Sequence, residues 1–545
     1  MPLQIAIFGG GISGLTAAHE LLDHYGKDII VTIYEKNNEV GGMARSTYVI
    51  DDEYGGLPSE HSWRGYAPFY YNFFDMVKRI DVSRVNANTR RTVYDNLVGP
   101  INFILPTNTR PDAPMPTYRD WLIGAYYTMR SVCADERNDL YKSIPFKTAV
   151  EDKLSKGGVD SYIKMLGPGL GLDQDKASIA TVAKFVETLD FRPWSVMNGP
   201  TNAALFDPWI SLLTRSMGMN IQYNSILSKI HMDHDGQGYL TNNIRSCELD
   251  DGTMIKADIY IMAIDPYSMA NIIRNSPTMK PCVGNLYGYS TCNGVQSTYA
   301  GSSIMQCPEL KKIIRTSNIS SIPQISFRFG FDVAIADQSN DVYAFPDSEF
   351  NITLYFQERF WSPKYTSLLP FKSYWSGTAC VTNVPGPLYG KPAVELTDDQ
   401  FLNECWYQIS RSFTDAGGKT INGTPPPTPI YGEVWNYRHE PPKWSNTVDT
   451  YKYRPSQRTA INNMYLTGAH TKTTMDIYSM EGAAEAGKLV ASMIIGGCVD
   501  IYKHTRFWLL KKIDNILYRL GLPSIVDVIL FILCVIIAIM VKSWI

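Results

Sequence analysis

The sequence predicts an α/β fold that carries an inserted α+β domain built on an antiparallel sheet and, towards the C-terminus, a membrane helix. Three observations lead to this prediction. Residues 4–25 have the order strand, glycine-rich turn and helix, and residues 464–488 repeat that order. An apolar run then extends from residue 528 to residue 541.

The composition excludes some classes of protein to which this chain could belong. The chain has 545 residues, with 50 Lys and Arg against 53 Asp and Glu and a formal net charge of −3. This length predicts more than one folded unit, and the charge balance predicts no nucleic-acid partner. Charged residues reach only 19%, so we expect the chain to contact something apolar, either a substrate or a membrane. The nine cysteines show no metal-site spacing, so no metal is predicted.

The first glycine turn lies between an apolar strand pattern at residues 4–8 and a helical pattern at residues 15–25. In a G-x-G-x-x-G turn the first glycine permits a tight turn, the second lets a pyrophosphate approach the backbone, and the third lets helix and strand pack closely. The free N–H groups of the first helical turn attract phosphates. The candidate cofactor contacts here are Gly9, Gly11, Ile12, Ser13 and Gly14.

An acidic residue follows the next predicted strand. The apolar run at residues 29–34 ends at Glu35, where a dinucleotide-binding fold places the acid that bonds the ribose hydroxyls. Lys36 beside it is a further candidate contact. Strand, glycine turn, helix, strand and acid together predict a Rossmann-like dinucleotide-binding unit, and a simple glycine-rich turn is the alternative.

The segment from Tyr34 to Arg45, Y-E-K-N-N-E-V-G-G-M-A-R, resembles the second motif of a flavoprotein superfamily. That superfamily includes flavin amine oxidases, phytoene and zeta-carotene desaturases and protoporphyrinogen oxidase. The resemblance implies FAD, with Gly42 and Arg45 against its pyrophosphate and the flavin edge, and a Rossmann-like FAD-binding domain of the amine-oxidase type. Arg45 offers a planar, permanently charged fork to phosphate oxygens. A surface loop with a solvated arginine is the alternative.

A further block resembles the second cofactor-domain segment of the same superfamily. It comprises residues 224–230, 247–253 and 259–263. The resemblance implies that the backbone of Ile230 passes beside the adenine. Taken by themselves, these residues indicate a hairpin and a buried strand, which many α/β proteins contain.

The C-terminal motifs resemble those of plant-type carotenoid desaturases. The patterns R-P-x-Q-R, Y-L-x-G-x-x-T-K and S-M-E-G-A occur in that order within residues 454–483. Gly468 follows a short apolar run, and Met480 opens a helix of small residues whose N-terminus can face a flavin edge. Both residues are therefore candidate cofactor contacts.

Two departures from the amine oxidases concern the substrate and the flavin linkage. Those enzymes have a cage tyrosine where this chain has Ser479, although the adjacent Tyr478 could restore a cage after a small shift of register. No cysteine occurs between Cys405 and Cys498, so the FAD is predicted to be bound non-covalently. An amine oxidase stays open as an alternative.

The aromatic segment at residues 58–74 resembles the desaturase block that lines the substrate channel. When it is aligned on Glu60, Ser62 replaces the family glycine and Arg64 replaces the family histidine. Arg64 is the candidate catalytic group, holding negative charge on the flavin or a substrate head group, and a structural salt bridge is the equal alternative. Ser62, Trp63 and Arg64 are candidate cofactor contacts, and His61 is expected to be an ordinary loop histidine.

These segments predict the following domains. The discontinuous FAD-binding domain comprises residues 1–85, 197–268 and 455–498, and the substrate domain comprises residues 86–196 and 269–454. Alternating residues at 326–331 and 351–356 predict half-buried strands of an antiparallel sheet in the substrate domain.

The tail is predicted to attach the chain to a membrane. Residues 499–521 form a basic amphipathic helix, and residues 522–545 form a single-pass anchor or, alternatively, insert into one leaflet. The catalytic domains are expected in the cytosol, with four basic side chains on the cytosolic leaflet. These are Arg506, Lys511, Lys512 and Arg519.

Together these features predict a membrane-associated FAD-dependent oxidoreductase that removes hydride from an apolar, isoprenoid or carotenoid-like substrate to flavin N5. The electron acceptor is a quinone or oxygen. The alternatives are an amine oxidase, a non-redox flavin isomerase or mutase, and a flavin-bound structural membrane protein.

Overall fold

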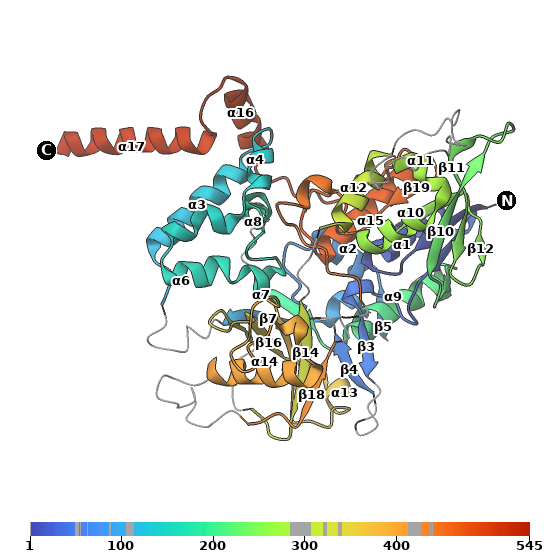
Figure 1. Ribbon diagram of the computed structural model, residues 1–545, viewed down its shortest axis with the longest axis horizontal. Helices are drawn as coiled ribbons and strands as arrows, with labels where there is room; N and C mark the ends of the chain where they lie inside the picture. The colour runs from blue at the N-terminus through green and yellow to red at the C-terminus, as the bar shows by residue number, and fades with distance from the viewer. Residues whose placement is uncertain are drawn as a thin grey trace, which may run out of the picture.

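The computed structural model describes residues 2–49, 54, 56–60, 62, 64–86, 89–104, 114–188, 190, 192–283, 307–319, 324–335, 341–412, 427–435, 438 and 440–544. Figure 1 shows a globular body from which one helix, α17, extends. Trp63 and His61 lie outside the described residues.

A parallel five-stranded sheet forms the centre of the first domain. Its order is β19 (Met464–Leu466), β13 (Ile259–Met262), β1 (Leu3–Phe8), β2 (Ile29–Tyr34) and β9 (Asn220–Gln222). Neighbouring strands are parallel throughout. The chain therefore builds this Rossmann-like sheet from segments that are far apart in the sequence.

Helices and a second sheet cover the two faces of this parallel sheet. Helices α1 (Ile12–Tyr25) and α15 (Met480–Ile495) pack on one face with the core side chains of β1 and β2. A Cβ on Gly487 would lie 2.5 Å from the Ser13 carbonyl oxygen, so α15 and α1 are in close contact. The other face packs on the antiparallel sheet of β10 (Leu227–His234), β11 (Leu240–Leu249) and β12 (Met254–Ile255), with α10 (Pro266–Asn275) and α12 (Pro308–Ser317).

A seven-stranded sheet forms the second large layer. Its order is β18 (Tyr431–Val434), β14 (Ile325–Phe331), β17 (Ser373–Ala379), β16 (Ile352–Phe356), β15 (Asp341–Phe345), β7 (Leu97–Ile104) and β8 (Trp194–Met197). All neighbours are antiparallel except β15 and β7, so the sheet is mixed rather than purely antiparallel. The prediction of half-buried strands is also wrong, because β14 and β16 are buried on both faces. Helix α14 (Asp398–Ser412) packs its Phe401, Cys405 and Ile409 on one face.

A group of helices connects this sheet to the tail (Figure 1). The members are α3 (Tyr118–Val132), α4 (Asn138–Ser143), α5 (Phe146–Val150), α6 (Lys156–Gly158), α7 (Leu166–Leu170) and α8 (Ile179–Glu187). They share a core that includes Phe146, Ile163 and Ile179. The remaining elements are β3 (Ser46–Val49), β4 (Leu57–Glu60), α2 (Tyr71–Lys78), β5 (Asp81–Asn86), β6 (Thr89–Thr92), α9 (Asp207–Ser211), α11 (Lys280–Val283) and α13 (Pro363–Thr366).

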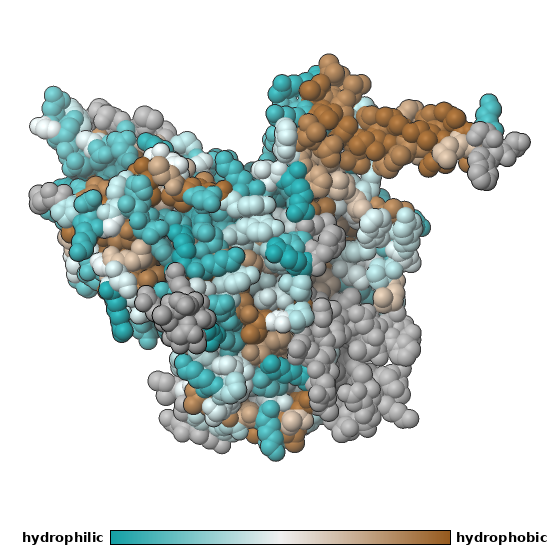
Figure 2. All heavy atoms as spheres, turned by 180° about the vertical axis from the view of Figure 1, so that it is seen from behind, coloured by the Kyte–Doolittle hydropathy of each residue, from teal (hydrophilic) through white to brown (hydrophobic). Residues whose placement is uncertain are grey.

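The tail contains two helices, α16 (Trp508–Arg519) and α17 (Ile525–Trp544). The amphipathic helix is shorter than the predicted range 499–521, because residues 499–507 form an irregular connection. Among the described helices, α17 alone is long and apolar enough to cross a membrane, and its apolar side chains from Ile529 to Val541 are exposed. Figure 2 shows α16 and α17 as one continuous hydrophobic surface.

Candidate functional site

A cavity of about 420 Å³ lies at the carboxyl ends of β1, β2, β13 and β19. This edge is where open parallel sheets bind their ligands. The seven-stranded sheet closes the cavity on the other side through Thr353 and Thr378. The predicted contacts that line it are Gly9, Gly11, Ile12, Ser13, Glu35, Lys36, Gly42, Arg45, Ser62, Arg64, Gly468 and Met480.

The glycines of the first turn have separate roles. Gly9 has a φ of +110°, and a Cβ there would lie 2.3 Å from the Ala263 carbonyl oxygen. A Cβ on Gly14 would lie 2.1 Å from the Gly9 carbonyl oxygen, so this glycine serves close packing and does not line the cavity. A Cβ on Gly11 would meet only the Gly42 Cα, at 3.8 Å, and would otherwise extend into open space. The space beside Gly11 therefore fits a pyrophosphate at the uncapped N-terminus of α1.

Glu35 is buried at the end of β2 and is fixed by three donors. One carboxylate oxygen accepts the Gly10 backbone N–H at 2.7 Å, and the other accepts the backbone N–H and the side-chain amide of Asn37 at 3.0 and 2.9 Å. The carboxylate lines the cavity and keeps lone pairs that can accept ribose hydroxyls. This arrangement fits the ribose of a dinucleotide.

Arg45 lies at the cavity wall between two carboxylates. It forms an ion pair with Glu440, and its Nε lies 3.5 Å from Glu39, whose pKa is raised by burial. It also donates to the Gly42 carbonyl at 3.0 Å. Lys36 Nζ lies 3.8 Å from the same Glu440. Glu440 therefore joins both basic side chains of this motif to the segment at 440–443.

Arg64 is held by structural partners. Its guanidinium lies 3.0 Å from the Glu60 carboxylate and donates to the Met43 carbonyl at 2.9 Å. Glu60 in turn accepts the backbone N–H and hydroxyl of Thr201, both at 2.8 Å. The observed contacts are those of the structural salt bridge that the sequence left open, although Arg64 also lines the cavity.

Ile230 does not reach the cavity. It is fully buried in β10, where its N–H donates to the Ser276 hydroxyl at 2.8 Å and its carbonyl accepts from the Thr278 hydroxyl at 3.1 Å. The residues of this segment that line the cavity are Ser225, Ile226 and Leu227. The predicted adenine contact at Ile230 is therefore misplaced by a few residues along the strand.

The C-terminal motif forms the second glycine turn at the cavity. Gly468 lies two residues after the end of β19 and has a φ of +145°. Met480 begins α15 as predicted, and Ser479 caps the helix by accepting the Gly482 N–H at 3.1 Å. His470 also lines the cavity, and burial lowers its pKa to about 3, so its imidazole is neutral.

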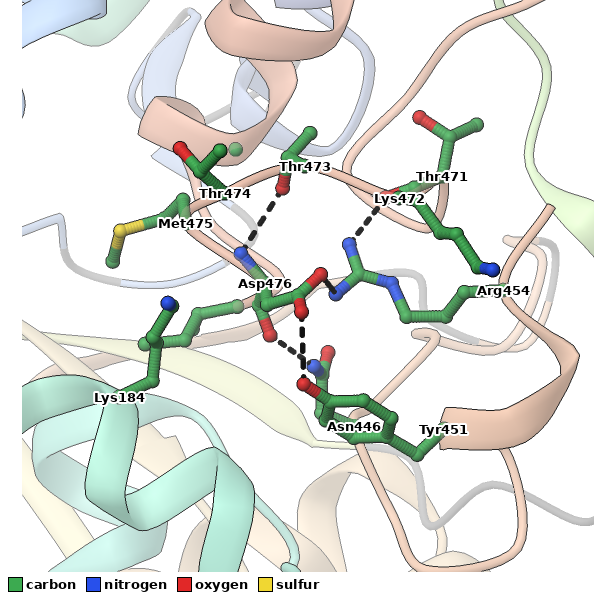
Figure 3. Close-up of polar contacts among 12 residues, drawn as sticks. Lys184, Asn446, Tyr451, Arg454, Thr471, Lys472, Thr473, Thr474, Met475 and Asp476 are labelled. Atoms are coloured by element: carbon green, nitrogen blue, oxygen red, sulfur yellow. Dashed lines mark hydrogen bonds and ion pairs between the residues drawn. The ribbon is translucent and has the colours of Figure 1, made fainter. Parts of the chain in front are cut away.

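A buried polar cluster holds the loop between Gly468 and Met480 (Figure 3). Asp476 forms an ion pair with Arg454 and accepts the Tyr451 hydroxyl at 2.9 Å, and its backbone carbonyl accepts the side-chain amide of Asn446. Arg454 also donates to the backbone carbonyls of Ala469 and Thr471. One arginine thus fixes both ends of the loop that faces the cavity.

A group of aromatic side chains forms part of the cavity wall. Phe69 makes ring contacts with Phe185 and Trp194, at centroid distances of 6.2 and 6.3 Å, and Tyr70 lies beside it. All four side chains line the cavity. Phe185 and Trp194 were not predicted, because they come from α8 and β8 and no motif surrounds them.

Lys443 and Cys380 are two further lining residues that the sequence did not identify. Burial lowers the pKa of Lys443 to about 8, and its ammonium donates to Gln324 at 2.6 Å. Burial raises the pKa of Cys380 to about 12. Among the described residues, no group of His, Cys, Asp or Glu could hold a metal ion.

Tyr478 lines the cavity, but its ring packs against Trp444 at a centroid distance of 5.7 Å. Trp444 is buried behind the cavity wall and is not part of the lining. An aromatic amine cage needs two rings that face each other across open space. The contact between Tyr478 and Trp444 leaves no such space between them.

Comparisons with known proteins agree with this arrangement. The family model described as a NAD(P)-binding Rossmann-like domain matches residues 7–80, and the one described as flavin containing amine oxidoreductase matches residues 347–495. The chain is 23% identical to the zeta-carotene desaturase of Arabidopsis thaliana over 538 residues, which cover 90% of this chain and 85% of the relative. The zeta-carotene desaturase of Solanum lycopersicum is likewise 23% identical, with 90% and 81% covered.

Solved structures share the fold. Putrescine oxidase bound to putrescine superimposes with a TM-score of 0.57 at 12% identity, and covers 91% of this chain and 99% of that one. Cyclohexylamine oxidase from Brevibacterium oxydans gives a TM-score of 0.54 at 13% identity, with the same coverage. The motifs, the glycine-lined cavity and these matches support one assignment: a flavin-dependent oxidoreductase similar to the flavin amine oxidases and the carotenoid desaturases.

Proposed function

We propose that this chain is a membrane-anchored oxidoreductase that binds FAD non-covalently and removes hydride from an apolar, isoprenoid or carotenoid-like substrate. A quinone or oxygen takes up the electrons. The observation that carries the proposal is the composition of the cavity wall, which combines glycines and charged groups such as Gly11 and Glu35 with the aromatic rings around Phe69 and Trp194.

The glycines and charged groups of the cavity wall would hold the dinucleotide. The N-terminus of α1 and Arg45 would bind the pyrophosphate, and Glu35 would accept the ribose hydroxyls. A bound flavin supplies the hydride acceptor at N5. Phe69, Phe185 and Trp194 would exclude water and orient an apolar chain beside it. Formation of a double bond would also release a proton from the neighbouring carbon, and water or the reduced flavin would take it up, so the scheme would need no protein side chain as a base.

Non-covalent binding is supported by the chemistry of Cys380, a cysteine in the lining. A thiol with a pKa of about 12 stays protonated at neutral pH and is a poor nucleophile. When the purified protein is precipitated with acid, all of the FAD should appear in the supernatant. Flavin that stays with the precipitate would contradict non-covalent binding.

Membrane attachment is supported by α17, which extends from the body and leaves its apolar side chains from Ile529 onward exposed. We propose a single-pass anchor with the catalytic domains in the cytosol. The chain should stay with the membrane fraction after alkaline extraction, and protease added to intact cells should not degrade the body.

The substrate class is tested by anaerobic reduction of the flavin. Purified protein in detergent is mixed with carotenoid precursors or, separately, with amines, while the flavin absorption band is followed. Bleaching by a polyene supports the proposal, and bleaching by amines alone overturns it. A flavin that neither class bleaches would favour a mutase or a structural flavoprotein. A Gly11→Val variant, expected to lack FAD, controls for light scattering by the apolar compounds.

A further inference from the structure

Helix α16 presents its apolar side to the outside. Leu509, Ile513, Ile516 and Leu520 are spaced so that they lie on one stripe, and their exposed fractions range from 37% to 67%. A helix on the surface of a soluble protein turns such a stripe towards the core. Figure 2 shows this hydrophobic surface running without interruption into α17.

The polar side of α16 packs against the body instead. Asp514 is fully buried, lies 3.1 Å from the Arg137 guanidinium and accepts the Ile525 backbone N–H at 2.9 Å. Lys511 forms an ion pair with Glu187 of α8 at 2.8 Å, and Arg519 pairs with Glu136. Lys511 and Arg519 were expected on a leaflet of the membrane. In the structure they instead contact carboxylates of the body.

Helix α3 also exposes apolar side chains. Tyr118, Trp121 and Leu122 in its first turns are all exposed. Helix α17 packs against α3, where Asp527 accepts the Tyr126 hydroxyl at 2.9 Å and lies 3.1 Å from Arg130. These contacts place the outer face of α3 beside the start of the spanning helix, and Figure 1 shows both helices on the same side of the molecule.

We propose that the α16 stripe and the outer face of α3 form a second membrane contact, which lies in the interfacial region of the bilayer that α17 enters. This rests on the proposed function, in which α17 spans a membrane. The occupant is a lipid surface because the patch is continuous with that helix. Its edge also carries residue types that are common at membrane interfaces, with Lys512 Nζ lying 4.8 Å from the Trp508 ring centroid. The ion pair between the buried Asp514 and Arg137 fixes α16 to the body, so the body keeps one orientation to the membrane.

Spin labels on matched leucines test the proposal. Leu520 of α16 and Leu368 beside α13 are similarly exposed, at 67% and 75%, and each is replaced by Cys in turn, as is Leu122 of α3. The background is the full chain with Cys498, Cys534 and Cys292 changed to Ser, since the first two are exposed and the third lies outside the described residues. Each labelled protein is first checked for retained flavin absorption and then reconstituted in vesicles of equal parts phosphatidylcholine and phosphatidylglycerol.

The accessibility of each label to a water-soluble nickel complex and to oxygen is then measured. We expect nickel accessibility at Leu520 and Leu122 to fall severalfold on reconstitution while oxygen accessibility rises, and the label at Leu368 to stay aqueous. A chain that floats with the vesicles while the Leu520 label stays as accessible to nickel as the Leu368 label overturns this proposal and leaves the α17 anchor standing.

Two other outcomes also overturn it. Dipolar broadening between Leu520 labels of different molecules would show that a second copy of the chain covers the stripe. A chain that does not float with vesicles would remove the membrane contact and the proposed anchor together.

Discussion

Arg454 and Asp476 form an ion pair in which the arginine is buried completely and the aspartate has a left-handed backbone, with a φ of +52°. Few residues other than glycine adopt this conformation, so the pair holds the loop in a shape that the backbone alone disfavours. The loop carries Tyr478 and Ser479 to the cavity. The geometry of the flavin site thus depends on a salt bridge that lies behind it.

Removing the arginine should leave the Asp476 carboxylate, which is 27% exposed, with the Tyr451 hydroxyl as its remaining side-chain donor, and should leave the Ala469 and Thr471 carbonyls without the guanidinium. We expect Arg454→Gln to destabilise the protein by about 1 to 3 kcal/mol and to reduce its FAD content. The matched control is Arg458→Gln, because Arg458 belongs to the same sequence motif but is exposed. Thermal unfolding and the flavin absorption per protein measure both effects. Equal losses in the two variants would contradict the role of the buried pair.

Filling the space beside Gly11 should remove the cofactor without unfolding the chain. In Gly11→Val the new side chain enters the cavity, since a Cβ there meets no protein atom closer than 3.8 Å. We expect loss of the flavin band with the circular dichroism spectrum preserved. Gly236→Ala is the control, because a Cβ at Gly236 meets nothing within 4 Å and faces no cavity. FAD retained at the native ratio in Gly11→Val would show that no pyrophosphate passes this glycine.

His19 should make the protein less stable in mild acid. Burial and, next, the charge of Arg79 lower its pKa to about 3, and its Nδ1 accepts the Trp209 indole N–H at 3.1 Å. The unfolded chain binds a proton below about pH 6.5 and the folded chain does not, so the stabilisation present above that pH is lost as the pH falls. The contribution of His19 to the slope of the free energy of unfolding against pH approaches about 1.4 kcal/mol per pH unit.

Replacing His19 by Asn keeps an acceptor for Trp209 and removes the titration. We expect the melting temperature of His19→Asn to fall less steeply between about pH 6.5 and 5 than that of the native protein. His24→Asn, at the exposed end of the same helix, should leave the native slope unchanged. If the melting temperature of His19→Asn fell with pH as steeply as that of the native protein, His19 would not be the cause of the loss of stability in acid.

The contact between the tail and the body should depend on Arg137. Arg137→Ala leaves Asp514 buried without its guanidinium, at a cost of about 3 to 5 kcal/mol to the docking of α16. We expect limited proteolysis near residues 520–524 to become faster while the flavin spectrum stays native. Lys142→Ala removes the exposed pair with Asp139 and should change neither, since surface pairs contribute about 0 to 1 kcal/mol.

The sequence identified those cavity-lining residues that belong to a continuous sequence motif. Gly9, Glu35, Gly468 and Met480 reach the cavity because a strand, a tight turn and a helix place neighbouring residues within a few ångströms of each other. Ile230 failed because a strand pattern does not show where along its length the ligand crosses. Lys443 lies in a segment without a motif and reaches the site only through the packing of two sheets.

The tail shows a different limit of prediction. Periodicity separates the apolar side of α16 from its polar side, but it does not show which side meets the protein. That outcome depends on Arg137, Glu136 and Glu187, which lie more than 300 residues away in sequence and bind the polar side. The fully buried strands β14 and β16 have the same explanation, since α14 and the first domain cover faces that the alternation alone predicted to be exposed.

The order of strands in the parallel sheet has a consequence for biosynthesis. Strand β1 pairs with β13, which pairs with β19, so the sheet lacks an edge strand until residues 464–466 have been translated. The Gly468 turn and α15 come later still. A nascent chain therefore cannot complete its cofactor cradle until α15 has left the ribosome. Only α16 and α17 are synthesised after α15. A product truncated before residue 464 therefore lacks both the cradle and α17, whereas one truncated between α15 and α17 keeps the cradle and lacks α17.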